Sequence, residues 1–474
     1  MTRPSVQLQT TVGGALADAF TALRDELGLA AEFPAEVEAE AQRAGADAGL
    51  PSADLTAIPF ITIDPQGATD LDQAMHLERR GTGYRVRYAI ANLPAFVEPG
   101  GAIDGEARRR GQTMYAPDGR IPLHPVAVSE NAASLLPGQE RGAYVWDFSL
   151  DADARILSTG LSMARIRSVR QAAYDEVQAE IDGGTASEML MLLREFGLKR
   201  IELERERGGA SLNRPSQEIT QSDGHYLLER RSALPVEDWN AQLSLMTGMA
   251  AATLMVDGGV GILRTMPAPD ADTIDSYRRQ TEALGCPWPE NMQYGEYLKT
   301  LDPSRPNQLS AIYAASKLFR GAGYTVIAGE LAQVPTQAAL GAPYTHVTAP
   351  LRRLVDRFAL VICDALANGT VVPVWVTEAL PALPATMAAS GSIASRLENG
   401  SVAAVEAAVL SPHLGELFDA TVISAGEDGG VIQLLDPAVS ADCVGRFRPG
   451  ERIRATLVTA DIISGTVQFA RVEP

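Results

Sequence analysis

Cysteine is scarce in this sequence: Cys286, Cys363 and Cys443 are the only three in 474 residues. They lie about 80 residues apart and form no CxxC pair, which argues against a disulfide framework and against a zinc site built on thiolates. We therefore predict that they are buried small residues.

Long apolar runs are also missing. No run approaches the roughly 20 residues that a membrane-spanning helix needs, and the start, MTRPSVQLQTT, lacks the basic end and apolar centre of a secretory signal. We therefore expect a cytoplasmic protein with no membrane partner. The hydrophobic content of 46% is enough for several packed cores, and 474 residues suggest about three domains.

Positive charge is in the minority. The chain has 40 Lys and Arg against 59 Asp and Glu, a formal net charge of −19. This balance disfavours non-specific nucleic-acid binding, because such affinity comes mainly from Lys and Arg that neutralise phosphates. A nucleic-acid substrate would require a local gathering of basic residues. The candidates are Arg108, Arg109, Arg110, Arg165, Arg167, Arg170, Lys199, Arg200, Arg352, Arg353 and Arg357.

Two catalytic classes lack their motifs. The five histidines are scattered, without an HxxxH or HExxH pair, which argues against a zinc hydrolase. No GxxxxGK loop occurs, so we expect no nucleotide cofactor.

The apolar periodicity changes along the chain. Residues 1–50 have helical spacing, and short strand-like runs begin at Leu55, including a hairpin around Gly81-Thr82-Gly83. Helical patterns recur at 172–182, 186–207, 236–255 and 350–369, and five strand-like runs after His413 predict a small barrel of the OB type. The Pro/Ala-rich stretch PALPATMAASGS (381–392) is the predicted linker. The predicted domains are 1–50, 51–400 and 411–474.

One acidic turn stands between two strand-like runs, in the stretch ITIDPQGATDLDQAM from Ile61 to Met75. If residues 70–72 are extended, Asp70 and Asp72 point to the same face, and Asp64 can lean in from the preceding strand. Such oxygen ligands suit Mg²⁺, which leaves positions for phosphate oxygens. A solvated turn rich in Asp, Gly and Pro is the alternative, and an EF-hand calcium loop fits less well. The spacing by itself does not decide.

Three stretches together resemble the catalytic domain of the ribonuclease II family. DLTAIPFITIDPQGATDLDQAMHLE (54–78) is similar to its opening signature, and residues 88–138 continue the likeness in order. YTHVTAPLRRLVDRF (344–358) resembles the second signature, about 280 residues later. The OB-like tail stands where the family carries an S1 domain. The resemblance covers roughly residues 50–474.

The resemblance implies processive hydrolysis of single-stranded RNA from the 3′ end, with release of nucleoside 5′-monophosphates and with Mg²⁺. The family's acidic quartet of metal ligands falls on Asp64, Asp70, Asp72 and Gln73, with Asp70 and Asp72 also assigned to catalysis. A neutral amide at Gln73 would keep a possible ligand but lose a charge, so a cation should bind more weakly.

The family's catalytic arginine falls on Arg352, which would stabilise charge on the phosphate with its planar fork. The alternative for Arg352 is a surface ion pair with Asp356. The resemblance also assigns RNA contacts to Thr348 and Arg353. Ala349 replaces a family serine, which removes one hydroxyl contact to the RNA backbone.

Further RNA contacts implied by the family fall on Tyr115, Tyr174 and Glu398. Tyr115 would stack on the bases next to the cleaved end, where stacking is worth roughly 1 to 3 kcal/mol per base. Tyr174 matches a tyrosine near the ribose, and Glu398 fits an acidic position by spacing alone. Each could instead be an ordinary packing or surface residue. The family's second stacking aromatic has no counterpart in residues 264–270.

Taken together, we expect an α+β catalytic RNB domain with a C-terminal five-stranded OB/S1 β-barrel and a short helical N-terminal segment. The expected protein is a monomeric, cytoplasmic 3′-to-5′ exoribonuclease acting on single-stranded RNA. Fifty helical residues cannot hold the cold-shock barrels that the family carries in front; they form either a helix-turn-helix-like RNA contact or a packing element. The rival functions are a catalytically weakened RNA-binding protein of the same fold and an unrelated magnesium phosphohydrolase.

Overall fold

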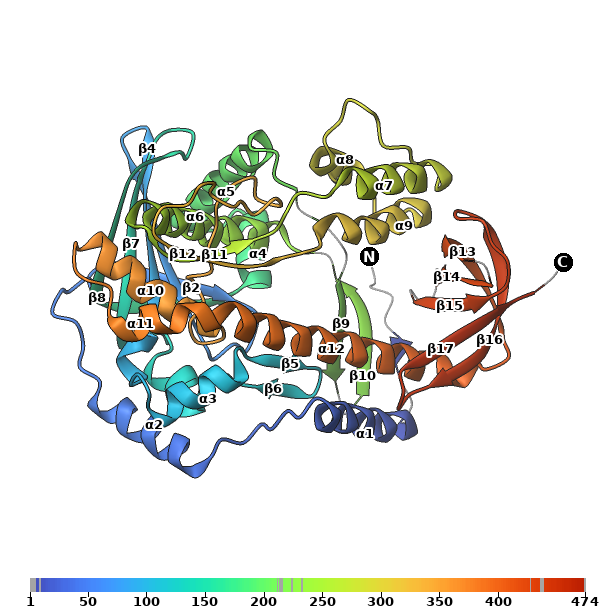
Figure 1. Cartoon of the computed structure of the whole chain (residues 1–474), viewed down its shortest axis with the longest axis horizontal. Helices are drawn as coiled ribbons and strands as arrows, with labels where there is room; N and C mark the ends of the chain where they lie inside the picture. The colour runs from blue at the N-terminus through green and yellow to red at the C-terminus, as the bar shows by residue number, and fades with distance from the viewer. Residues whose placement is uncertain are drawn as a thin grey trace.

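Two closed five-stranded barrels lie towards opposite ends of the molecule's long axis, and the helix α12 (Leu383–Leu410) runs between them (Figure 1). The computed structural model describes residues 6–7, 10–210, 212, 216–222, 225–231, 233–426, 428–434 and 439–472. The mixed α+β architecture and the C-terminal barrel confirm the predicted fold class.

The first barrel has the strand order β2-β3-β4-β7-β8 and is closed by parallel pairing of β2 with β8. Its core is aromatic and β-branched, with Tyr84, Tyr88, Trp146 and Phe148 all almost fully buried. The predicted hairpin is confirmed, since Arg80 pairs with Gly83 across the turn. The strands are β2 (Phe60–Asp64), β3 (Gln73–Arg80), β4 (Gly83–Ala91), β7 (Glu140–Leu150) and β8 (Ile156–Ala173).

Helices and two small hairpins follow the strands of this barrel in the sequence, and three of these helices, between residues 271 and 314, pack together in a separate core between the two barrels (Figure 1). Each predicted helical pattern between 172 and 369 is present, although the last helix begins at Leu354 because residues 350–353 form a turn. The helices are α3 (Ala102–Arg110), α4 (Tyr174–Asp182), α5 (Glu188–Glu206), α6 (Pro235–Gly258), α7 (Ala271–Ala283), α8 (Tyr294–Thr300), α9 (Pro306–Ala314), α10 (Leu354–Ala367) and α11 (Val374–Ala379). The hairpins pair β5 (Met114–Ala116) with β6 (Gly119–Ile121), and β11 (Val260–Thr265) with β12 (Gly323–Ala328).

The predicted linker is wrong. Residues 383–392 form the start of α12, a continuous helix of 28 residues. Pro384 is tolerated because it lies in the first turn, where its missing N–H is not needed, and the alanines that follow favour a helix. Met387 and Ser390 are buried, so this stretch is part of the packed protein.

The C-terminal barrel has the order β13-β14-β15-β17-β16 and confirms the five predicted strands. Its interior is small and apolar, with Val422, Ile432, Leu457 and Phe469 buried together. The strands are β13 (Leu417–Ala425), β14 (Gly429–Leu434), β15 (Ser440–Val444), β16 (Arg452–Asp461) and β17 (Thr466–Arg471).

The N-terminal region is helical, as predicted, in α1 (Thr10–Glu26) and α2 (Ala35–Asp47). The two helices pack in different places. Leu16 and Phe20 of α1 pack against the C-terminal half of α12, whereas Val37 and Ala41 of α2 join the core beside the first barrel. A short strand, β1 (Val6–Gln7), adds to the hairpin of β9 (Ser216–Ser222) and β10 (His225–Arg231).

Apolar helix length and the state of the cysteines can be read from the fold. Across the described ranges, no helix is long and apolar enough to cross a membrane. All three cysteines are free: Cys363 and Cys443 are buried, as predicted, and Cys286 is half-buried.

Candidate active site

The barrel topology brings the acidic turn and Tyr174 together at one end of the first barrel. Asp64 is the last residue of β2 and Gln73 is the first of β3, and the two strands are antiparallel neighbours. Ala173, the last residue of β8, pairs with Asp64, and Tyr174 follows it at the start of α4. Residues that are far apart in the sequence therefore meet at this end.

The turn between β2 and β3 is held by hydrogen bonds to its backbone. The Ser134 hydroxyl donates to the Thr69 carbonyl (2.7 Å) and accepts from the Leu71 N–H (2.9 Å). The Gln171 amide donates to the Ala68 carbonyl (2.7 Å). Gly67 has φ +80°, a backbone conformation that favours glycine. These contacts fix where the carboxylates that follow can point.

Burial makes a negative charge unfavourable at both Asp64 and Asp72. Burial and the charge of Asp70 raise the pKa of Asp64 to about 7, and its Oδ2 is buried without a hydrogen-bond partner. Asp72 is 4% exposed, and burial raises its pKa well above the usual range. A negative charge at either position is costly unless a cation accompanies it.

Asp70, the third carboxylate of the acidic turn, is paired with an arginine. Its Oδ1 accepts from Arg120 Nη1 at 2.6 Å, and the same guanidinium also meets Glu130 (2.7 Å). In the part of the chain that the structure describes, no three His, Cys, Asp or Glu side chains gather closely enough to hold a metal ion. Two carboxylates with retained waters remain compatible with Mg²⁺, which is commonly bound in that way.

Arg120 is a site residue that sequence reasoning missed. It lies on β6 directly opposite Tyr115 of β5, and it ties this hairpin to the acidic turn through Asp70. The sequence does carry a signal for it. The stretch APDG after Tyr115 is a turn pattern, and a tight hairpin there places residue 120 across from residue 115.

The second motif forms a turn, residues 348–353, which faces Asp72. The Leu351 N–H donates to Asp72 Oδ1 (2.8 Å), and Arg352 Nε lies 3.8 Å from Asp72 Oδ2. The Arg352 side chain is 43% exposed, so its guanidinium is accessible to a substrate. Asp72 and Arg352, about 280 residues apart in the sequence, are therefore neighbours.

The predicted alternative of an ion pair between Arg352 and Asp356 is wrong. Asp356 pairs with Arg353 instead, which donates from Nε (2.9 Å) and Nη2 (2.8 Å). Asp356 is fully buried and also accepts from the Ala349 N–H (2.7 Å). Burial disfavours the charge of Arg353, but Asp356 holds its pKa above the usual value. This pair fixes the turn that presents Arg352.

We expect Arg353→Met to destabilise the protein, because it leaves the buried Asp356 carboxylate without its partner. Removing one member of a buried pair typically costs about 3–5 kcal/mol. Thermal unfolding should show a Tm lower by several degrees. Arg305→Met is the matched control, since Arg305 pairs with Asp302 at the same spacing but is 68% exposed, and its Tm should not change. An equal Tm for both variants would contradict a structural role for Arg353.

Three other residues predicted to contact RNA, Tyr115, Tyr174 and Thr348, differ in exposure and in hydrogen bonding. Tyr115 is 53% exposed, and the surrounding protein and the charge of Asp70 raise its pKa to about 12. Burial and the charge of Asp64 likewise raise the pKa of Tyr174 to about 12, and its hydroxyl accepts from Asn240 (3.1 Å). Thr348 is buried, and its carbonyl accepts from Gln73 (2.6 Å).

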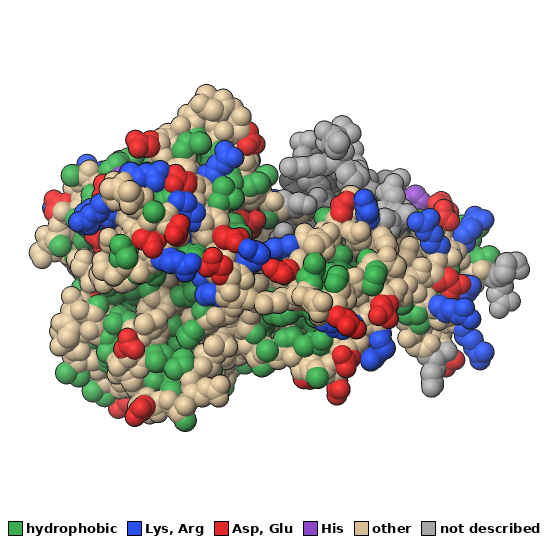
Figure 2. Space-filling view, turned by 90° about the horizontal axis from the view of Figure 1, so that it is seen from above, with side chains coloured by type: hydrophobic (Ala, Val, Ile, Leu, Met, Phe, Trp, Pro, Cys, Tyr) green, Lys and Arg blue, Asp and Glu red, His purple; other side chains and the backbone are tan. Residues whose placement is uncertain are grey.

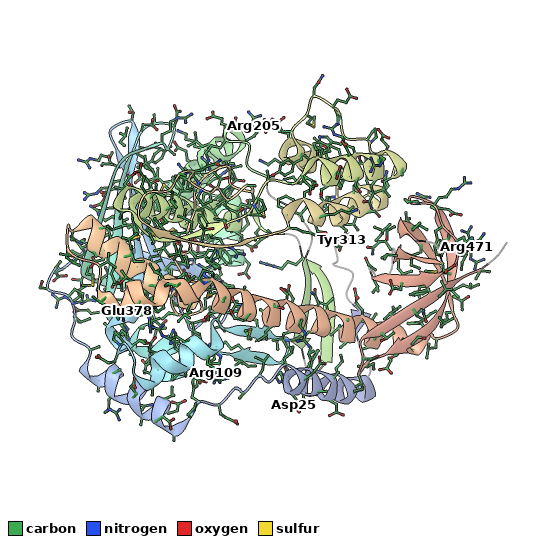
Figure 3. The ribbon with its side chains drawn as sticks, viewed as in Figure 1. Asp25, Arg109, Arg205, Tyr313, Glu378 and Arg471 are labelled. Carbon is green, nitrogen blue, oxygen red and sulfur yellow. The ribbon has the colours of Figure 1, made fainter. Side chains whose placement is uncertain are left out.

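Glu398 lies apart from the acidic turn. It lines a cavity of about 870 Å³ formed by α7, α9, α12 and the C-terminal barrel, together with Lys317 and Tyr313. Figure 3 labels Tyr313 on the side of α9 turned towards α12. None of the acidic-turn residues lines this cavity. An RNA contact at Glu398 stays a prediction.

Most of the basic residues that were candidates for RNA binding are paired with carboxylates, so much of their positive charge is balanced within the protein. Figure 2 shows Lys and Arg intermixed with Asp and Glu on the face that it presents. The pairs are Arg108 and Arg357 with Asp104, Arg109 and Arg110 with Glu106, Arg165 with Asp54, Arg167 with Glu140, Arg170 with Glu180, Lys199 with Glu195, and Arg353 with Asp356.

Comparison with known proteins identifies the families that match the two barrels and their surroundings. The RNB domain family matches residues 52–366, and the RNase II-type exonuclease C-terminal S1 domain matches residues 416–472. Ribonuclease R of Thermotoga maritima is 23% identical over 503 residues, covering 95% of this chain and 70% of the relative. Exoribonuclease 2 of Serratia proteamaculans is 37% identical over 139 residues, covering 29% of this chain and 22% of the relative.

Solved structures share the fold. Mycoplasma genitalium RNase R in complex with ribose methylated single-stranded RNA superposes with a TM-score of 0.86 at 18% identity, covering 96% of this chain and 78% of that chain. Yeast Ssd1, a pseudonuclease, superposes with a TM-score of 0.69 at 17% identity, covering 87% of this chain and 54% of that chain. The RNB match spans well over half of the sequence, and the chain belongs to the RNB-domain family of 3′-to-5′ exoribonucleases, the ribonuclease II and R family, with a C-terminal S1 domain.

Proposed function

We propose that this protein degrades single-stranded RNA processively from its 3′ end, by Mg²⁺-dependent hydrolysis to nucleoside 5′-monophosphates. The observation that carries the proposal is the pairing of Asp72 with Arg352 at 3.8 Å, in which the carboxyl is buried and the guanidinium is exposed. Such a pair offers a cation-holding anion and a phosphate-binding cation side by side.

Asp64 and Asp72 would hold the metal, because both are buried carboxyls that lack a full complement of positive partners. Bound Mg²⁺ would supply Lewis-acid polarisation of the scissile phosphate and a more acidic water. Asp70 shares its charge with Arg120, so we assign it to orienting the turn and the Tyr115 hairpin as well as to the acidic site.

Arg352 would bind the phosphate as charge builds up on its oxygens. Its backbone is fixed from both sides, since its carbonyl accepts from the Thr113 N–H (3.0 Å) and its neighbour Leu351 donates to Asp72. A backbone that is fixed before the substrate arrives reduces the reorganisation that the guanidinium needs in order to stabilise the transition state.

A second candidate is an RNA-binding protein of this fold with weak or no catalysis. Two observations favour it. Arg120 forms an ion pair with Asp70, and Gln73 stands at a position where the family resemblance would place an acidic residue. Yeast Ssd1, which shares this fold, is a pseudonuclease, so the fold is compatible with a protein that lacks nuclease activity. The unrelated small-molecule phosphohydrolase is set aside by the family match.

One experiment separates the two candidates. The protein is incubated with single-stranded RNA labelled at the 5′ end or at the 3′-terminal phosphodiester, with Mg²⁺ or with chelator, and with excess unlabelled RNA added after binding. A processive exoribonuclease releases labelled mononucleotide at once from the 3′-labelled RNA and shows no intermediate lengths from the 5′-labelled RNA. Binding in a gel-shift assay without any Mg²⁺-dependent product would overturn the proposal in favour of the second candidate.

Tyr115→Ala should change where digestion stops more than how fast it begins. Losing roughly 1 to 3 kcal/mol of stacking raises the off-rate of short oligomers by about 5- to 150-fold, whereas long RNA keeps its phosphate contacts. We expect a limit product several nucleotides longer on sequencing gels. Tyr313→Ala is the comparison, since Tyr313 lines the separate cavity at α12. An unchanged limit product in Tyr115→Ala would mean that this ring does not hold the RNA end.

A further inference from the structure

Gln73 has both ends of its amide engaged within the protein. Its Nε2 donates to the Thr348 carbonyl at 2.6 Å, and its Oε1 accepts from the Tyr88 hydroxyl at 3.0 Å. The Tyr88 hydroxyl also meets the Ser244 hydroxyl at 2.8 Å. The amide therefore links β3 to β4 and α6 on one side and to the turn that carries Arg352 on the other.

The orientation of this amide follows from its partners. The Thr348 carbonyl can only accept, so the nitrogen of Gln73 must face it and the oxygen must face Tyr88. Tyr88 is almost fully buried, which keeps its hydroxyl in this arrangement. The oxygen of Gln73, the atom that could bind a cation, is thus directed at Tyr88.

Asp72 and Gln73, which are adjacent where the acidic turn meets β3, supply the two kinds of contact that the turn at 348–353 requires. Asp72 accepts from the Leu351 N–H, and Gln73 donates to the Thr348 carbonyl, so the backbone is held on both sides of Ala349 and Pro350. Asp356 accepts from the Ala349 N–H between them. A carboxylate at position 73 could make no such donation and would place a negative charge against a carbonyl oxygen.

We propose that Gln73 is a positioning residue, which sets the turn that presents Arg352 to the substrate, and that it is not a metal ligand. The inference rests on the proposed function for the role of Arg352. It differs from the family-based expectation in what it predicts for Gln73→Asp. A restored acidic ligand would tighten metal binding, whereas a lost donor loosens the turn and leaves metal binding no tighter.

The test compares Gln73→Leu, Gln73→Asp and wild type in two measurements that need no turnover. The first is Mn²⁺ affinity, followed by the electron paramagnetic resonance signal of the free ion. The second is deuterium uptake by the backbone of residues 346–354. We expect Mn²⁺ affinity within about threefold of wild type in Gln73→Leu, and uptake in this segment faster by about tenfold in both variants, since each loses one hydrogen bond of the turn.

The matched control is Gln280→Leu, which also removes an amide that donates to a backbone carbonyl, that of Ile423 at 3.1 Å. It should leave both measurements unchanged. Tyr88→Phe removes the hydroxyl that orients Gln73 and should raise uptake in the same segment to a smaller extent. Unchanged uptake in Gln73→Leu, or tighter Mn²⁺ binding in Gln73→Asp, would overturn the proposal.

Activity then shows whether Gln73 acts through Arg352. We expect Gln73→Leu to lower kcat by about 10- to 100-fold with KM for RNA changed little, because misplacing a catalytic group by about 1 Å has effects of this size. In an Arg352→Lys background the same change should cost less than about threefold, since residues that act as a unit are not additive. If kcat of the double variant fell by the product of the two single-variant losses, Gln73 would have a role separate from that of Arg352. A wild type without Mg²⁺-dependent turnover would defeat the proposed function, while uptake and Mn²⁺ affinity would still decide the role of Gln73.

Discussion

Asp72→Asn is expected to abolish turnover, by about 10³-fold or more, while leaving the fold and RNA binding close to wild type. The substitution is nearly isosteric, and its remaining oxygen can still accept from the Leu351 N–H, so the turn stays in place. What disappears is the charge that would hold the metal and face Arg352. Because burial raises the pKa of Asp72, the neutral amide should not lower the Tm.

The measurements are single-turnover degradation of labelled RNA, RNA affinity by fluorescence anisotropy and thermal unfolding. Asp364→Asn is the matched control, since the pKa of this half-buried carboxyl on α10 is also raised by burial. It should keep wild-type turnover. Removal of a charge that holds the metal should cost far more than about tenfold in rate. If Asp72→Asn retained more than about a tenth of the wild-type rate, Asp72 would therefore have no part in the chemistry.

Arg352→Lys is expected to lower kcat by about 10²- to 10³-fold, although the charge is kept. A lysine ammonium is a point charge on a flexible stem and cannot grip two phosphate oxygens as the planar guanidinium does. The backbone contact of residue 352 with Thr113 does not depend on the side chain, so the turn should remain. RNA affinity should fall by no more than about threefold, because long RNA makes many other contacts.

Single-turnover rates at saturating enzyme separate the chemical step from binding. Arg305→Lys, at an exposed arginine on the surface, is the matched control and should change neither rate nor affinity. An Arg352→Lys enzyme with about half of the wild-type rate or more would show that this position supplies only charge, without the fork geometry.

Patterns that are local in the sequence predicted the fold well. Alternating apolar residues gave the hairpin at Gly81-Thr82 and the five C-terminal strands, because each strand buries one face and exposes the other. The Pro/Ala stretch at 381–392 misled, since alanine is at once a common linker residue and the best helix former. Only burial against the rest of the protein distinguishes the two.

The candidate site was predictable where motifs were recognisable and not where partners are distant in the sequence. Asp64, Asp72 and Arg352 could be chosen from their motifs, but which arginine meets Asp356 depends on the turn at 350–353. The pairing of Asp70 with Arg120 requires knowing that the Tyr115 hairpin lies over the acidic turn. Four of the carboxylate partners of the basic residues were likewise not predictable, because the pairs Arg165–Asp54, Arg167–Glu140, Arg170–Glu180 and Arg357–Asp104 join separate elements.

The length of α12 carries a consequence for how this chain can vary. A helix of 28 residues is about 42 Å long, and each residue inserted into it would turn everything beyond the insertion by about 100°. The face formed by Ala404, Val405 and Ala408, which receives α1, would then point away from its partner. Insertions near whole numbers of turns, such as seven residues, approximately restore the phase and shift the C-terminal barrel outward by about 10 Å. The number of residues in α12 therefore sets how the C-terminal barrel is rotated relative to the first barrel, and only insertions close to whole helical turns would preserve that rotation.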